Sequence, residues 1–166
     1  MTTTLRLLTL AMLTSSLFGL TNCKKYSEPE PKKTSEREMW LTSPGWKLES
    51  FAIEETTAGG VVTTTNYPLT SFDPCSLDDL EYYHADKSFT VNEGSVKCSA
   101  TYPQFLTSGT WAFASGDTEI VINPGQPRVI SRHIRTLTAT GLSLADPSQS
   151  SSNGNKSVQI RTYSAH

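Results

Sequence analysis

The residues best suited to chemistry lie between Cys75 and Trp111. This stretch contains the acidic side chains Asp78 and Asp79, with Asp73 just before it. Carboxylates are good calcium ligands, but the spacing here lacks the oxygen-ligand pattern of a calcium-binding loop. Aspartates in turns usually accept hydrogen bonds from nearby backbone amides instead. We therefore expect solvated turns and no metal site.

A histidine in the same stretch raises the question of acid–base catalysis. His84 follows Tyr82 and precedes Asp86, and a histidine beside a carboxylate can transfer protons near neutral pH. His133 and His166 are distant in the sequence, and no motif of a serine hydrolase or a zinc protease is present. The sequence therefore predicts that His84 is a surface residue. We expect no catalytic residue and no cofactor, and a protein that is not an enzyme.

Arginines recur along a later segment at Arg128, Arg132 and Arg135. Side chains alternate between the two faces of a strand, so Arg128 and Arg132 would share a face that Arg135 does not. We expect a solvated sheet face here and no common anion site. The chain has 14 Lys and Arg against 16 Asp and Glu. Because nucleic-acid binding needs a basic excess or stripe, we expect no nucleic-acid partner.

Alternating apolar residues between turn residues predict many short strands. A change of phase after Leu48 indicates a bulge near Ser50, and Gly59-Gly60 indicates a hairpin. Another hairpin is predicted at residues 85–87. The predicted strands cover residues 46–54, 61–67, 80–84, 88–93, 109–114, 119–123, 128–137, 141–145 and 156–163, with a further strand that reaches Cys98.

Strands of this length joined by short turns are typical of antiparallel sheets, and the simplest arrangement is an up-and-down meander. Closure of the meander removes its exposed edges. We therefore predict an all-β fold in which the meander closes into a small β-barrel of about eight strands. Ser35 and Glu38 have the spacing of a capping box, which predicts a short helical turn that could cover one end of the barrel.

The N-terminal residues have the character of a secretory signal peptide. Arg6 precedes an apolar run over residues 7–20 that is too short for a permanent membrane helix. The run ends in Leu20-Thr21-Asn22-Cys23, which resembles the lipobox of bacterial lipoproteins except that Asn22 replaces the usual small residue. The resemblance implies cleavage before Cys23, lipidation of Cys23 and an outer-membrane lipoprotein, periplasmic or exposed at the surface. The alternative is an ordinary secretory signal that leaves Cys23 as a free thiol.

The segment after Cys23 combines alternating charges with prolines and one aromatic residue, a composition that cannot form a core. We therefore predict a cleaved signal peptide over residues 1–22, a flexible tether over residues 23–38 and a barrel domain over residues 39–166. The membrane would be contacted only through the lipid.

The remaining cysteines, Cys75 and Cys98, would lie in an oxidising compartment if the protein is exported. A disulfide between them is the economical interpretation, and two separate buried thiols are the alternative. Such a bond would add about 3 kcal/mol of stability by the loop-entropy argument. The cysteines and histidines lack the spacing of a zinc site.

The order of Cys75, Asp78-Asp79, Tyr83, Asp86, Phe89, Glu93-Gly94, Cys98 and Gly109-Thr110-Trp111 is similar to that of a known family. It resembles the lipocalin-like domain of Bacteroidetes-type bacterial lipoproteins. Lys87 stands where a turn glycine is usual, and Gly45-Trp46 lacks the spacer of the G-x-W motif of true lipocalins. The resemblance implies a small β-barrel on a lipoprotein and says little about a substrate.

The apolar alternation also predicts the barrel interior. The expected core residues are Trp46, Leu48, Phe89, Val91, Trp111, Phe113, Ile120, Ile122, Leu142, Leu144, Val158 and Ile160. A barrel of this size has room for side chains or for one small ligand. We favour core packing, and if a pocket exists, we expect its lining to be Trp46, Phe89, Trp111 and Phe113.

The leading functional hypothesis is a monomeric, lipid-anchored binding protein for a small apolar or amphipathic ligand. The alternative is a structural or interaction lipoprotein whose filled barrel contacts a protein or glycan through its loops. The volume of the interior distinguishes the two hypotheses.

Overall fold

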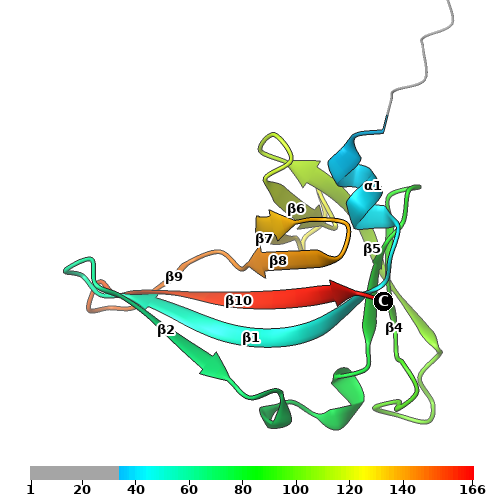
Figure 1. Ribbon diagram of the computed structural model, residues 1–166, viewed down its shortest axis with the longest axis horizontal. Helices are drawn as coiled ribbons and strands as arrows, with labels where there is room; N and C mark the ends of the chain where they lie inside the picture. Colours follow the sequence, from blue (N-terminus) through cyan, green and yellow to red (C-terminus); the bar gives the residue numbers. More distant parts are fainter. Residues whose placement is uncertain (1–33) are drawn as a thin grey trace, which may run out of the picture. The chain divides into compact units, whose positions relative to one another are not determined.

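The predicted strands form a closed antiparallel barrel with one helix at an end (Figure 1). The computed structural model describes residues 34–166, so the predicted signal peptide, Cys23 and most of the tether lie outside the described residues. The elements are α1 (Glu36–Thr42), β1 (Trp46–Thr56), β2 (Val62–Tyr67), η1 (Leu69–Ser71), η2 (Pro74–Ser76), β3 (Leu80–Tyr83), β4 (Ser88–Asn92), β5 (Phe105–Ala114), β6 (Glu119–Ile122), β7 (Ile130–Leu137), β8 (Gly141–Ala145), β9 (Gln149–Ser150) and β10 (Lys156–Ala165).

Eight strands close the barrel in the order β1, β3, β4, β5, β6, β7, β8 and β10, and β10 pairs with β1 again. The strand pairs within residues 34–166 are antiparallel. The closing pair runs from Trp46 opposite Ala165 to Thr56 opposite Lys156. Bulges interrupt β1 between Leu48 and Ser50, as predicted, and also β5 opposite Phe89 and Thr90 and β7 between Ile134 and Thr136. The all-β fold and the small closed barrel predicted from alternation are therefore confirmed.

Strand β2 lies outside the barrel, which a simple meander does not anticipate. It forms the predicted hairpin with β1 but pairs only with residues 51–56, whereas β3 pairs with Trp46 and Lys47 on the same edge of β1. Neither strand pairs with β1 at residues 48–50, where the bulge lies. The wall of the barrel therefore opens at this point, and the connection over residues 68–79, with η1 and η2, spans the opening (Figure 1).

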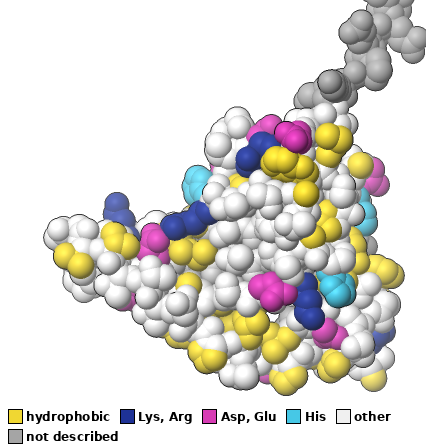
Figure 2. Space-filling view, viewed as in Figure 1, with side chains coloured by type: hydrophobic (Ala, Val, Ile, Leu, Met, Phe, Trp, Pro, Cys, Tyr) yellow, Lys and Arg dark blue, Asp and Glu magenta, His cyan; other side chains and the backbone are white. Residues whose placement is uncertain are grey.

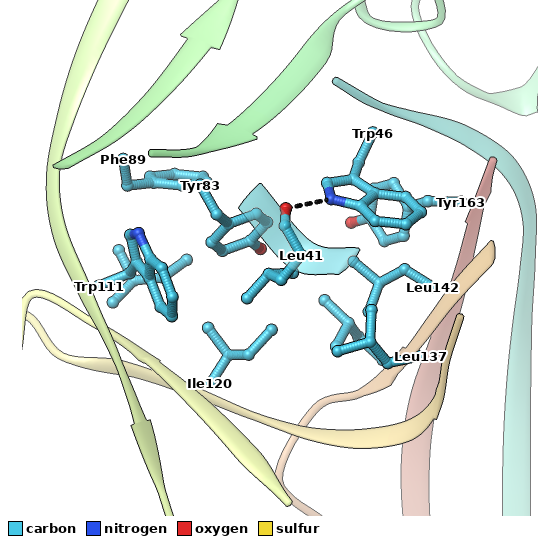
Figure 3. Packing of buried hydrophobic residues seen from close by; sticks show 11 residues of the cluster. Leu41, Trp46, Tyr83, Phe89, Trp111, Ile120, Leu137, Leu142 and Tyr163 are labelled. Carbon is cyan, nitrogen blue, oxygen red and sulfur yellow. Dashed lines mark hydrogen bonds between the residues drawn. The ribbon is translucent and has the colours of Figure 1, made fainter. Parts of the chain in front are cut away.

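The core of the barrel is densest near α1. Leu41 is fully buried, and its carbonyl oxygen accepts a hydrogen bond of 2.9 Å from the indole Nε1 of Trp46 (Figure 3). Trp111 packs edge-on against Tyr83, whose ring contacts Phe89. The aliphatic residues of β6 to β8 complete this packing, and Ile120, Leu137, Leu142 and Leu144 are all buried.

Helix α1 begins at the predicted cap. The Ser35 Oγ accepts a hydrogen bond from the Glu38 amide, as the capping-box spacing indicates. The Glu38 carboxylate binds the Lys87 ammonium at 2.6 Å instead of returning to Ser35, and Arg37 donates to the carbonyl oxygen of Asp117. These contacts join the helix to two turns of the barrel. Residues 36–38, which the sequence assigned to the tether, therefore belong to the helix that covers the barrel end.

Lys87 explains why its turn needs no glycine. Its φ of 71° lies in the left-handed region that favours glycine. The side chain compensates by two contacts, because its ammonium lies 4.1 Å from the centre of the Trp111 ring as well as beside Glu38. The turn therefore has an unfavourable backbone conformation at Lys87, but the Lys87 side chain holds helix α1 against the barrel.

The predicted disulfide between Cys75 and Cys98 is present, which confirms the pairing. It links η2 to the loop after β4 across 23 positions of sequence. The predicted strand up to Cys98 is wrong, because residues 93–98 form no strand. Asp78 holds this loop instead, since its Oδ2 accepts from the amides of Ser95 and Val96.

The phase predicted for the last strand is also wrong. Tyr163 is buried and packs in the core cluster, whereas Val158 and Ile160 are half-buried and lie outside that cluster. Tyr163 pairs with Leu48 and Leu142, so the inward face of β10 carries residues 161 and 163.

The visible surface carries charges of both signs close together, with apolar side chains scattered among them (Figure 2). Among the described residues, no helix combines the length and apolar character that a membrane span requires.

Candidate functional site

One hollow lies outside the barrel and does not enclose a site. It measures about 570 Å³ and is lined by residues that are exposed or half-buried: Gly109, Thr110, Asn123, Gln126, Pro127 and Arg128. A ligand site normally buries most of its ligand. The outer hollow therefore does not fit a ligand site.

The opening in the barrel wall forms a smaller and deeper cavity, which we call the wall cavity. Its volume is about 270 Å³, and its lining consists of Trp46, Leu48, Phe72, Ser76, Asp79, Glu81, Val91, Arg161 and Tyr163. The cavity lies where β1 changes partner from β2 to β3, because Leu48 is in the bulge and Phe72, Ser76 and Asp79 come from the connection that spans the gap. The break in sheet pairing therefore creates the site.

One side of the wall cavity is an ionic network inside the barrel. The Glu81 carboxylate accepts hydrogen bonds from Tyr83 Oη at 3.0 Å and Tyr163 Oη at 3.2 Å, and Arg132 Nη1 lies 3.3 Å from its Oε2. Each partner satisfies part of a carboxylate that would be costly to bury alone. The network explains why β3 and β7 carry charged residues on their inward faces.

The network continues to the rim through Asp146. Arg132 Nε lies 3.4 Å from one Asp146 oxygen, and Arg161 Nη1 binds the other. Arg161 also lies over the Phe51 ring, with 5.5 Å between its guanidinium carbon and the ring centre. A second hollow of about 370 Å³ shares Arg161 with the wall cavity and also includes Arg132 and Asp146.

Burial and mutual contacts change the acidity of these groups. Burial, followed by the negative charge of Glu81, raises the pKa of Tyr83 and of Tyr163, so both hydroxyls stay protonated donors. Burial is the largest effect on Arg132 and opposes its charged form, but Glu81, Tyr163, Tyr83 and Asp146 together outweigh burial and raise the pKa of Arg132. Arg132 therefore keeps its positive charge at physiological pH.

Asp79 differs from the other carboxylates of the cavity. Its Oδ1 is buried without a hydrogen-bond partner, and no Lys or Arg within residues 34–166 forms an ion pair with it. Burial, and then repulsion from Glu93, Asp78 and Glu81, raises the pKa of Asp79 to about 6. Asp78 behaves in the opposite way, because hydrogen bonds from Ser95 lower its pKa.

Of the four predicted pocket residues, the structure places only Trp46 at the wall cavity. Phe89 and Trp111 are buried in the core near α1, and Phe113 packs edge-on against Trp111 at 5.3 Å between ring centres. The four residues thus share the interior of one barrel but do not lie around one cavity.

The predictions for the other chemical residues have mixed outcomes. Nε2 of His84 lies 2.8 Å from Thr90 Oγ1 and its ring stacks on Tyr82, while Asp86 accepts from Ser88, so no proton-transfer pair forms between His84 and Asp86. The solvated face predicted for the arginines is wrong for Arg132, whose side chain is only 14% exposed.

Arg128 and Arg135 match the surface interpretation better. Arg128 is exposed beside the outer hollow, and Arg135 forms a two-pronged ion pair with Glu54 at 3.0 Å on the outer face. The three arginines do not share an anion site. Arg132 turns inward because β7 begins at Ile130 and pairs Arg132 with buried Ile120.

Asp79 was predicted to lie in a solvated turn but instead lines the wall cavity with a buried Oδ1. The sequence did not single out Glu81, Arg161 or Tyr163. The signal available was weak: Glu81 and Tyr83 alternate on one strand, as do Arg161 and Tyr163 on another. Within the described part of the chain, no group of three or more His, Cys, Asp or Glu side chains is arranged to hold a metal ion. The chain matches no protein-family model, and comparison with curated protein sequences gives no match.

Proposed function

We propose that this protein is an exported, lipid-anchored and non-enzymatic binding protein of lipocalin-like type, which holds a small amphipathic molecule in the wall cavity. The observation that carries the proposal is the composition of that cavity. Trp46, Leu48, Phe72 and Val91 supply apolar walls, and a few polar groups converge on the same space from β3, β10 and the connection over residues 68–79. Apolar walls with a small number of placed polar groups are typical of ligand sites.

The size of the cavity limits the ligand. About 270 Å³ is slightly below the usual range of ligand pockets, which begins at roughly 300 Å³. The buried core fills the interior near α1, so a large lipid would have to displace these side chains. We therefore expect a ligand with a short apolar body, seated in the wall of the barrel and not along its axis.

Cavity-blocking variants test the proposal with 1-octanol as the probe. Ser76→Trp places a large side chain in the lining, whereas Ser71→Trp makes the same change at an exposed position of the same connection, outside the lining. Isothermal titration calorimetry should show saturable 1:1 binding to the natural protein and to Ser71→Trp. Ser76→Trp should bind at least about tenfold more weakly.

The alternative is an interaction protein with a filled barrel, and the tightly packed end near α1 favours it. Native mass spectrometry of the protein from its natural source separates the two functions. A small-molecule adduct that disappears in Ser76→Trp supports binding in the wall cavity. No adduct, together with no octanol binding, would instead support the interaction protein.

The anchor is tested separately, because Cys23 lies outside the described residues. Cys23→Ser should move the protein from the membrane fraction to the soluble fraction, since lipid chains provide stable anchoring only when they are attached. Unchanged fractionation would contradict lipidation and would leave the cavity proposal unaffected.

A further inference from the structure

We propose that the ligand of the wall cavity carries a protonated amine, or a similar cationic donor, which pairs with Asp79. The inference rests on the proposed binding function and adds the chemical class of the ligand's polar end. The inference follows from the distribution of charge around the cavity.

Most charges at the wall cavity are already neutralised. Glu81 is paired with Arg132 and receives two tyrosine hydroxyls, and Arg161 is paired with Asp146. Arg132 also approaches Asp146, so these four side chains form a chain of alternating charge. An incoming ligand would gain little from any of them without breaking an existing ion pair.

Asp79 is the exception in the lining. Its side chain reaches the cavity from the residue before β3, and within the described residues it has neither a cationic partner nor a hydrogen bond to its Oδ1. The charged groups that act on it most strongly are all carboxylates: Glu93, Asp78 and Glu81. Asp79 and the four side chains of this alternating network together contain three carboxylates and two guanidinium groups. One negative charge is therefore unmatched.

An unmatched carboxylate in a partly buried cavity selects for cations. A protonated amine would supply both an opposite charge and N–H donors, and charge-assisted hydrogen bonds are about twice as strong as neutral ones. A carboxylate or phosphate ligand would face Asp79 and Glu81 while the nearest guanidinium, Arg161, is occupied by Asp146 and lies over Phe51. The apolar wall formed by Leu48, Phe72 and Val91 then accommodates the rest of the ligand.

Three probes with the same apolar chain and different ends test this inference. Octylamine, 1-octanol and octanoate should be titrated at pH 7.5 by calorimetry, where the amine is protonated and Asp79 is ionised. We expect octylamine to bind at least about tenfold more tightly than 1-octanol, and octanoate to bind most weakly. Asp79→Asn should reduce the affinity for octylamine to that for 1-octanol.

The matched control is Asp73→Asn, which makes the same change at an exposed position of the same connection, outside the lining. It should keep the full preference for octylamine. If 1-octanol binds but octylamine does not bind more tightly, or if Asp79→Asn keeps the preference, the amine inference is wrong and the binding function stands. If none of the three probes binds the natural protein, both proposals are overturned.

Discussion

The two ends of the barrel interior are built by different physical means. Near α1 the interior is apolar and closed, with Leu41, Trp46 and Trp111 almost completely buried. Further along the same strands, the inward positions carry Glu81 and Arg132, and the wall opens beside Leu48. Packing holds the first region, whereas hydrogen bonds and ion pairs hold the second.

The contrast between the two ends shows how a small barrel can be stable and still contain a cavity. The closed end supplies the buried apolar area that dominates folding free energy. The open end can then tolerate a gap and an unpaired carboxylate, because the groups around them are fixed by neighbours such as Tyr83 and Tyr163. These hydroxyls lie at the boundary, with their rings in the core and their oxygens on Glu81.

The largest effect should come from damage to the closed end. Leu41→Ala would leave a hole beneath α1 and should lower the free energy of unfolding by about 2 to 5 kcal/mol. Met39→Ala removes a side chain that is 49% exposed on the same helix and should cost less than about 0.5 kcal/mol. Urea denaturation measures both, and similar costs would mean that the helix does not complete the core.

The second-largest effect is expected from a change in the charge balance of the open end, which we expect to determine the stability of that region. Arg132→Met leaves the Glu81 carboxylate inside the barrel without its cation and should cost about 3 kcal/mol at pH 7. The double variant Arg132→Met with Glu81→Gln removes both charges and keeps an oxygen for the tyrosine hydroxyls. It should recover most of the lost stability in the same denaturation experiment. A double variant as unstable as the single one would show that packing, and not charge balance, dominates here.

At Asp79 we expect a smaller change in the free energy of unfolding, and substitution should increase the stability instead of lowering it. Its pKa of about 6 in the folded protein lies above the value of about 3.9 in an unfolded chain. Between these values the folded state retains a proton that the unfolded state has released, so stability falls as pH rises from about 4 to about 6.

Asp79→Asn should remove this loss. After a discount for solvent screening of a partly exposed group, the variant should be more stable than the natural protein by about 1 kcal/mol at pH 7.5. Near pH 4 the two should be equal. Denaturation curves at both values check the sign, and a variant that is less stable at pH 7.5 would contradict it.

The smallest effect concerns the turn that holds the helix. Lys87→Gly relieves the positive φ but loses the contacts with Glu38 and Trp111, so its net change should be within about 0.5 kcal/mol. Lys87→Ala loses the contacts without the relief and should be less stable than Lys87→Gly by roughly 1 kcal/mol. Thermal unfolding of the pair measures the difference, and equal stabilities would contradict strain at this turn.

Features that depend on local order could be predicted from the sequence. The bulge near Ser50, the hairpin at residues 85–87, the cap at Ser35 and the disulfide of Cys75 and Cys98 all follow from turn residues, phase or cysteine number. Strand alternation likewise identified Trp46 and Trp111 as inward-facing.

Features that depend on which strands meet could not be predicted in this way. Arg132 and Arg161 look like surface residues in their own strands, and only the closed barrel brings their charges onto Glu81 and Asp146. The alternation of Val158 and Ile160 suggested the wrong inward face of β10, because a strand that is half-buried on both faces gives two apolar patterns. The wall cavity exists because β1 exchanges β2 for β3. The phase change near Ser50 marks the bulge at this point, but it does not show that β1 changes partner there.

The pairing of β1 with β10 has a consequence for folding. Trp46 lies opposite Ala165, so the barrel closes only when segments from nearly the full described length of the chain have met. Contacts this distant in sequence slow folding relative to proteins of local contacts. Until they form, the edges of β1 and β10 are open to strands of other molecules. We therefore expect the yield of refolded monomer to fall as protein concentration rises, although in the finished barrel these two edges cover each other.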